Sequence, residues 1–251
     1  MFGWARKSRR AQNDLIYDVG MHAGHDTDFY LSKGFRVVAI EANPTLASAA
    51  RQRFADSIRR RQLTILNVGI TDQPGVLPFY INEQIDEWSS FNRDYASRGF
   101  PVREINVEIC TISDVVNRHG VPYYAKIDIE GYDHVALRGF LEQQAKPRFI
   151  SYENPHPGLF EWLVAAGYSR FKVVSQLKVP QYKCPLRSRE GRSIEYSFLP
   201  GSSGPFGEDT PGDWMDAESM RKRISIIEQE RLDALKHTIY PEWFDMHAGF
   251  D

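Results

Sequence analysis

Short apolar strands alternate with helical segments along the first part of the chain, and this alternation constrains the fold more than any other feature. Residues 15–20 form an apolar run that ends in a glycine turn, residues 26–33 have a helical pattern, and residues 36–41 form a second, β-branched run. Because a strand, a helix and a following parallel strand connect in a right-handed crossover, this order predicts a parallel sheet. Asn43 and Pro44 then suit the cap and first position of another helix.

The alternation continues to about residue 199 with one interruption. Residues 82–103 lack a regular apolar period and are expected to form an irregular excursion. We therefore predict an α/β fold with a mostly parallel seven-stranded sheet and helices on both faces. The other strands expected in this sheet are residues 63–70, 123–129, 148–153, 171–175 and 194–199, with a short additional strand at 76–81 and helices at 111–119, 133–144 and 158–166.

The composition narrows the function classes. Hydrophobic residues make up 42% of the 251 residues, which is enough for a sizeable core. The formal net charge of −2 argues against a nucleic-acid partner, because proteins that wrap nucleic acid carry a basic excess. No apolar run reaches the roughly 18 residues of a membrane span. No signal-peptide pattern follows the basic N-terminus, so we expect a cytoplasmic protein. Cys110 and Cys184 lie far apart, so neither a disulfide framework nor a metal site is expected.

The composition changes at Pro200, where a stretch rich in glycine, proline and serine begins. We expect a flexible N-terminus over residues 1–13, one domain over 14–200, and a C-terminal loop and helical tail over 201–251 that packs on the domain. A charged amphipathic helix is expected at 216–237. It fits a solvated helix packed on the domain, a dimerisation element or an active-site cover, so the sequence leaves a homo-oligomer open.

A glycine turn follows the first strand, in the segment from Asp18 to Gly24 that reads Asp-Val-Gly-Met-His-Ala-Gly. Glycines between a strand and a helix allow the backbone to approach a ligand closely, and the helix N-terminus offers free N–H groups. The spacing of Gly20 and Gly24 is G-x-x-x-G, which differs from the G-x-G-x-x-G of dinucleotide-binding proteins. Taken alone, this spacing is also typical of a simple tight turn.

Glu41 ends the second strand about 20 residues after the glycine turn. An acid at this position can accept hydrogen bonds from ribose hydroxyl groups. The alternative is an exposed loop carboxylate beside a helix cap. Together with the glycine turn, Glu41 favours a nucleoside-bearing cofactor at the carboxyl edge of the sheet.

The strand expected at 123–129 continues into three ionisable residues that alternate with isoleucines, namely Lys126, Asp128 and Glu130. In a regular strand these residues share one face. A buried lysine needs charged partners, which the two carboxylates could provide. The segment therefore indicates either a structural ion-pair network or a site that binds a cofactor amine and a substrate hydroxyl.

The order of these segments resembles the FkbM family of class I methyltransferases, across roughly residues 14 to 154. The chain departs from the family at Met21 and His22, where Ala-Asn is common. The segment Lys-Ile-Asp-Ile-Glu-Gly, beginning at Lys126, is the most discriminating. The matching segments are 18–24, 41–44 (Glu-Ala-Asn-Pro), 67–72 (Asn-Val-Gly-Ile-Thr-Asp), 89–91 (Ser-Ser-Phe) and 126–133.

The resemblance implies a Rossmann-like class I methyltransferase fold with S-adenosylmethionine as methyl donor. The acceptor it implies is a hydroxyl group of a sugar, glycolipid or natural product, carried by a small molecule or a glycan. The resemblance also assigns cofactor contacts. Asp18, Gly20 and Gly24 would surround the methionine part, Glu41 would hold the ribose, Asn67 and Val68 would lie near the adenine, and Asp128 would sit beside the sulfonium and the acceptor.

A hydroxyl acceptor needs a group that receives its proton. Asp128 is the first candidate and Glu130 the second, because both follow the same strand. Glu153 and His156 follow the strand expected at 148–153 and are further candidates, and histidine titrates in the useful range. A lone loop histidine is more often incidental, so His156 ranks below the carboxylates.

Two other functions share part of the pattern. A nicotinamide- or nucleotide-sugar-dependent Rossmann enzyme also has a glycine turn and an acid after the second strand, although its glycine spacing is tighter. A non-catalytic domain of the same fold would bind the cofactor without transferring its methyl group. The sequence does not identify the acceptor.

Overall fold

The computed structural model describes residues 12–237 and 241–251. The chain divides into two compact units, Met1–Pro147 and Arg148–Asp251. The boundaries expected at residues 13 and 200 stay predictions, and residues 1–11 of the expected flexible N-terminus lie outside the described residues. Gln12 and Asn13 already belong to the first strand.

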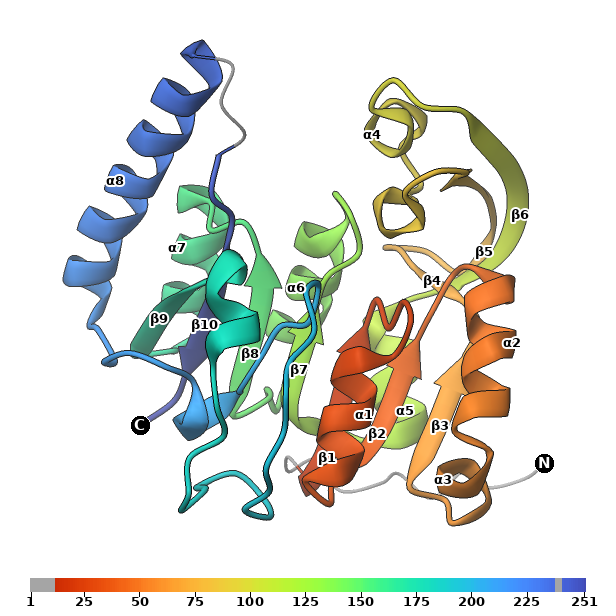
Figure 1. Ribbon diagram of the computed structural model, residues 1–251, viewed down its shortest axis with the longest axis horizontal. Coiled ribbons are helices and arrows are strands. Elements are labelled where there is room, and N and C mark those ends of the chain that lie inside the picture. Colours follow the sequence, from red (N-terminus) through yellow and green to blue (C-terminus); the bar gives the residue numbers. More distant parts are fainter. Residues whose placement is uncertain (1–11, 238–240) are drawn as a thin grey trace. The chain divides into compact units, whose positions relative to one another are not determined.

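The first unit contains a four-stranded parallel arrangement in the order β3-β2-β1-β7. In Figure 1, α1 and α2 lie in front of these strands and α5 lies behind them. This is the layering expected when crossovers run from β1 in both directions along a sheet. The elements are β1 (Gln12–Val19), α1 (His25–Ser32), β2 (Arg36–Ile40), α2 (Pro44–Arg53), α3 (Ala55–Arg59), β3 (Leu63–Leu66), α5 (Ile112–His119), β7 (Pro122–Ile127) and α6 (Asp133–Leu141).

Local chemistry explains where these elements begin and how they pack. Asn43 caps α2 by accepting a hydrogen bond from the Thr45 amide, and Thr111 forms a capping box at the start of α5. Tyr17 lies in the core, where its hydroxyl donates to the Gly120 carbonyl at 2.6 Å. This bond provides the partner that a buried hydroxyl requires.

A separate three-stranded sheet in the first unit has the order β4-β6-β5. The strand expected at 63–70 is split, because β3 pairs with β2 whereas β4 pairs with β6. The excursion expected at 82–103 contains two short helical segments, and it is followed by a strand, β6, that was not expected from the sequence. The elements of this region are β4 (Gly69–Ile70), β5 (Gly75–Asn82), η1 (Asp86–Trp88), α4 (Arg93–Ser97) and β6 (Val102–Cys110). The core of the three-stranded sheet consists of Phe79, Ile81, Val107 and Ile109.

The second unit contains three strands in the order β8-β10-β9, with β10 antiparallel to both neighbours. The strand expected at 194–199 is wrong, because Ser197 forms only an isolated bridge with Lys183. The strand in its place is β10, in a segment expected to form part of a helical tail. The elements are β8 (Phe149–Glu153), α7 (Pro157–Ala165), β9 (Arg170–Ser175), η2 (Gln176–Gln181), η3 (Gly207–Asp209), α8 (Ala217–Lys236) and β10 (Phe244–Gly249).

The predicted fold class is confirmed. Four strands of the first unit and three of the second make up the seven, and β10 accounts for the antiparallel part. Among the described residues, no helix combines the length and the apolar character that crossing a membrane requires.

The central position of β10 can be tested by a cavity substitution. Met246→Ala removes a side chain that is fully buried in β10, so we expect a loss of about 2–5 kcal/mol in the free energy of unfolding. Leu186→Ala is the control, because Leu186 is 95% exposed and should change stability by less than about 0.5 kcal/mol. Urea denaturation measures both, and equal midpoints would contradict the placement of β10.

Candidate active site

The turn after β1 lies at the carboxyl end of the strand, where open parallel sheets bind ligands. Gly20 and Gly24 have left-handed backbone torsions, with φ of 87° and 78°, which glycine adopts without a steric penalty. The Gly20 amide donates to the Ile40 carbonyl at 3.0 Å, which ties the turn to β2. A Cβ on Gly20 would lie 1.7 Å from the Asp128 carbonyl oxygen. The turns after β1 and β7 are therefore in direct contact.

Glu41 follows β2 and is buried beside the glycine turn. Its Oε2 accepts a hydrogen bond from the His22 amide and its Oε1 accepts one from the Asn43 amide, both at 2.8 Å. Burial raises the pKa of Glu41, and these two hydrogen bonds oppose the rise. Each carboxylate oxygen can accept a further hydrogen bond, so the group can still receive hydroxyl donors from a ligand. The structure adds a role that the sequence did not show, since Glu41 also fixes the glycine turn.

Lys126 links the two turns. The register of β1 and β7 pairs it with Asp18, and its ammonium donates to the Gly20 carbonyl at 2.7 Å. The same ammonium lies 3.4 Å from a carboxylate oxygen of Asp18 and 3.4 Å from one of Asp128. Asp26, in the first turn of α1, lies 3.9 Å away. A buried charge needs such partners, and here Asp18 and Asp26 take the place that the sequence analysis gave to Glu130.

Asp18 is completely buried. Its Oδ2 accepts a hydrogen bond from the Thr27 hydroxyl at 2.6 Å, which connects β1 to α1. Asp18 therefore helps to hold the glycine turn in place through its contacts with Lys126 and Thr27. Its predicted contact with a cofactor stays a prediction.

The acidic turn after β7 departs from the regular strand that the sequence predicted. The strand ends at Ile127, two residues earlier than expected. Glu130 and Gly131 then have φ of 45° and 90°. These left-handed torsions end the regular alternation of the strand, yet a Glu130 carboxylate oxygen still lies within 4.8 Å of one of Asp128.

Two carboxyl groups near this turn are harder to ionise than usual. Burial, assisted by the neighbouring Asp128 charge, raises the pKa of Asp133 to about 7. The same two causes raise the pKa of Glu130 to about 8. Asp133 has a structural partner, because its Oδ1 accepts a hydrogen bond from the Ile129 amide at 2.9 Å. Glu130 is therefore the carboxyl group with both a perturbed pKa and a place at the turn that faces the glycine loop.

The excursion between β5 and β6 packs on this acidic turn. The Ser90 hydroxyl donates to the Glu130 carbonyl at 2.7 Å, and an Arg98 nitrogen lies 2.7 Å from the Glu130 carboxylate. The rings of Trp88 and Tyr95 both lie against the Arg98 guanidinium. Arg98 was not predicted, because no period or motif marks it within an irregular segment.

Asn67 and Val68 lie in the break between β3 and β4. The Asn67 amide group donates to the carbonyls of Glu41 and Ala42, at 2.8 and 3.1 Å. Asn67 therefore fixes the backbone that carries Glu41, and Val68 is half-buried beside it in sequence. The predicted adenine contacts of both residues stay predictions.

His156 lies in the second unit, where it caps α7. Its Nδ1 accepts a hydrogen bond from the Gly158 amide at 3.1 Å. This capping contact gives His156 a structural function, and its predicted part in proton transfer stays a prediction.

Within the first unit, His22, Asp86 and Glu87 offer side-chain atoms within 4.8 Å of one another, a spacing that a metal ion could bridge. His22 Nε2 already lies 3.0 Å from Asp86 Oδ1 in a hydrogen bond. This bond explains the cluster without an ion, and we assign no metal to it.

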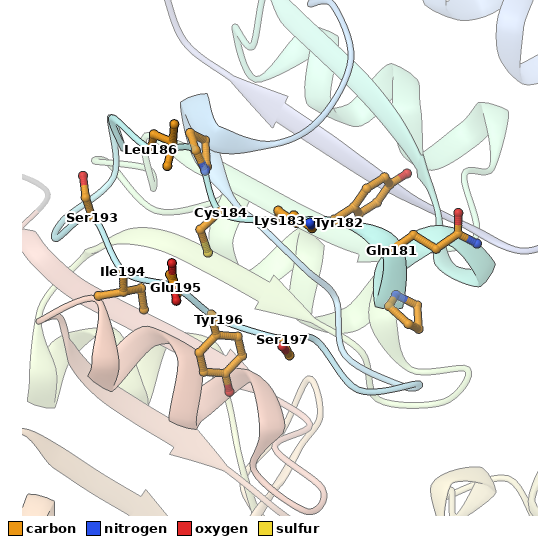
Figure 2. Close-up of a pocket in the computed structure, with 12 residues that line it drawn as sticks. Gln181, Tyr182, Lys183, Cys184, Leu186, Ser193, Ile194, Glu195, Tyr196 and Ser197 are labelled. Atoms are coloured by element: carbon orange, nitrogen blue, oxygen red, sulfur yellow. The ribbon is translucent and has the colours of Figure 1, made fainter.

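A pocket of about 650 Å³ lies in the second unit between two antiparallel segments, residues 180–186 and 193–197 (Figure 2). Residues 178–192, which include the first of these segments, carry several basic side chains. Lys183 lines the pocket, whereas Arg187, Arg189 and Arg192 do not. Arg189 instead lies 3.5 Å from Glu208. None of the predicted site residues lines this pocket.

The sequence matches one family model, the methyltransferase FkbM domain, over residues 18–172. No curated protein matches the sequence. Among solved structures, the chain is similar to the methyltransferase FkbM from Methylobacillus flagellatus KT, with 17% identity, a TM-score of 0.43, and coverage of 68% of this chain and 41% of that one. This chain therefore spans less than half of that protein's length.

Two further structures are similar over most of this chain. For the precorrin-6y C5,15-methyltransferase from Geobacter metallireducens GS-15, the identity is 9%, the TM-score 0.41, and the coverage 97% of this chain and 82% of that one. For a SAM-dependent O-methyltransferase from Thermotoga maritima, the identity is 9%, the TM-score 0.38, and the coverage 96% and 61%.

The contact between the two turns predicts unequal effects of two glycine substitutions. Gly20→Ala adds a Cβ against the Asp128 backbone, whereas Gly99→Ala adds one in open space at nearly the same φ, 91° against 87°. We expect Gly99→Ala to cost about 1 kcal/mol from the backbone torsion alone, and Gly20→Ala to cost at least about 2 kcal/mol more. Thermal unfolding of both variants measures the difference, and equal losses would show that the turns do not touch.

Proposed function

The chain belongs to the FkbM methyltransferase domain family, and from this premise we propose that it transfers a methyl group from S-adenosylmethionine to a hydroxyl oxygen of a sugar, glycolipid or natural product. The observation that carries this proposal is that the Lys126 ammonium contacts both the Gly20 carbonyl and the Asp128 carboxylate. It joins a glycine turn suited to a nucleoside-bearing cofactor with carboxylates suited to receive a proton.

The residues present fit S-adenosylmethionine. Gly20 and Gly24 leave the backbone of the turn open to close approach by a ligand. Glu41 presents a carboxylate whose position is fixed by two backbone amides and which suits ribose hydroxyl groups. Asp128 is partly exposed beside the turn, where a carboxylate suits the positive charge of a sulfonium or the amino group of the methionine part.

When bound, S-adenosylmethionine supplies a methyl group on a positively charged sulfur, and the sulfur keeps the bonding electron pair as a neutral thioether after transfer. The protein must align the acceptor oxygen with this methyl group, and alignment alone can contribute several kcal/mol to the rate. The hydroxyl oxygen forms the new bond to carbon, and its proton passes to a carboxylate of the protein.

Glu130 is the better proton acceptor of the two carboxylates. Its raised pKa, about 8, is close to the pH at which a general base is most effective. Asp128 is held by the Lys126 ammonium, so we assign it to orienting the cofactor and the acceptor. This assignment reverses the order given by the sequence, where Asp128 ranked first.

Cofactor identity can be tested by calorimetry with S-adenosylhomocysteine and, as a competitor class, NAD. We expect the wild type to bind the first and not the second. Glu41→Gln should weaken the binding at least about tenfold, because an amide nitrogen replaces one acceptor oxygen that receives a backbone amide. Glu104→Gln, an exposed change in β6, is the matched control. Binding of NAD alone would show that the enzyme class is wrong.

The role of Asp128 can be tested by transfer of an isotopically labelled methyl group to a panel of sugars, glycolipids and hydroxylated natural products. We expect Asp128→Ala to lower turnover at least about 100-fold while the protein stays folded, because Asp128 is partly exposed. Asp114→Ala is unsuitable as a control because Asp114 caps α5, so Asp72→Ala, an exposed acid in the first unit, serves instead. Near-normal turnover of Asp128→Ala would remove the residue from the mechanism.

A further inference from the structure

Arg98 connects the excursion to the acidic turn through an ion pair with Glu130. Its Nη2 lies 2.7 Å from Glu130 Oε2, and both side chains are mostly shielded from water, with 29% and 16% exposed. Ion pairs in such a partly buried position are screened less by water and salt than surface pairs. When Glu130 is ionised, its attraction to Arg98 is therefore screened less than that of a surface pair.

Two aromatic rings fix the guanidinium in this position. Its carbon lies 4.7 Å from the centre of the Trp88 ring and 4.3 Å from the centre of the Tyr95 ring, distances at which cation–π attraction operates. The Arg98 Nε also donates to the Tyr95 carbonyl at 3.2 Å. Arg98 itself has a φ of 40°, an uncommon torsion that persists where surrounding contacts determine the conformation.

The same excursion holds the backbone on which Glu130 is carried. The Ser90 hydroxyl donates to the Glu130 carbonyl, and the Tyr95 ring lies 3.5 Å from the place that a Cβ on Gly131 would occupy. Glu130 has a left-handed φ of 45°. One segment therefore restrains both the backbone and the carboxylate of Glu130.

The charged groups around Glu130 shift its pKa in opposite directions, and Arg98 is the cation among them that lowers it. Within the first unit, the titratable groups that act on it are Asp128 from the turn after β7, Asp133 from α6, and Arg98 and Tyr95 from the excursion. Burial and the two aspartates favour the neutral acid. Arg98, with a hydrogen bond involving Tyr95, favours the carboxylate.

We propose that Arg98 is a positioning residue that orients the Glu130 carboxylate and stabilises its charged form, so that Glu130 can receive the proton of the acceptor hydroxyl. This inference rests on the proposed methyl transfer. As the hydroxyl oxygen bonds to the methyl carbon, its O–H bond breaks and the proton moves to a Glu130 oxygen. Arg98 remains protonated throughout and faces a neutral acid after the transfer.

The direct test is a pH titration of the protein labelled with ¹³C at the glutamate carboxyl groups, with the Glu130 signal identified by its loss in Glu130→Gln. We expect the wild-type midpoint to lie well above that of an ordinary glutamate. Arg98→Met should raise it further, by about one unit or more, because removal of an opposite charge within about 4–6 Å has an effect of this size. Arg98→Lys keeps the charge and should recover most of the shift.

The matched control is Arg103→Met, which removes an arginine that lies 3.9 Å from Glu83 with both side chains about half exposed. It should leave the Glu130 midpoint unchanged. A purely structural Arg98 would lower the melting temperature of Arg98→Met and leave the midpoint where it is in the wild type. That result, in a variant shown to be folded by circular dichroism, would overturn the proposal.

The pH profile of methyl transfer provides the second readout. Because Glu130 must be ionised, activity should rise with pH through its pKa, and a higher pKa in Arg98→Met should move this rise to higher pH. At a fixed pH below the pKa, each unit lowers the rate about tenfold. A profile that does not follow the Glu130 midpoint would contradict the proposal. If the wild type methylates no acceptor, the proposed function fails, whereas the titration still decides whether Arg98 controls Glu130.

Discussion

The rest of the site depends on one buried ammonium group. Lys126 donates to the Gly20 carbonyl and lies within ion-pair distance of Asp18, Asp26 and Asp128. An unpartnered charge in the interior would be costly, so these groups must assemble around Lys126 when the unit folds. Since they come from β1, α1 and the turn after β7, their assembly fixes the glycine turn against the acidic turn. The absence of a side chain on Gly20 permits that contact.

Two further groups of residues stabilise this pair of turns, one at the end of β2 and one in the excursion between β5 and β6. Glu41 and Asn67 hold the backbone at the carboxyl end of β2, through bonds to main-chain groups. The excursion between β5 and β6 supports the opposite side and brings Arg98 to Glu130. In the proposed reaction the first group receives the nucleoside and the second controls the proton. The family membership gives the class of reaction, and these contacts supply the physical basis for assigning its steps.

The sequence predicted the parts of the fold in which local pattern and tertiary structure agree. Buried β-branched runs and a capped helix identified β1, β2 and α2, and the period-two spacing of Lys126 and Asp128 correctly placed both beside one another. β10 was missed because Asp245 and His247 are polar, yet all six of its residues are buried. The departure of Glu130 from the strand depends on backbone torsions that residue spacing does not encode, and Arg98 gains its role only through contacts distant in sequence.

The most direct test of the account is a crystal structure of the protein with S-adenosylhomocysteine bound. We predict that the ribose hydroxyl groups lie within hydrogen-bonding distance of the Glu41 carboxylate, that the turn from Gly20 to Gly24 contacts the ligand, and that Lys126 still bonds to the Gly20 carbonyl. A ligand bound elsewhere, for example in the pocket between residues 180–186 and 193–197, would contradict the central claim. So would a ligand bound at the turn with the Lys126 contacts broken.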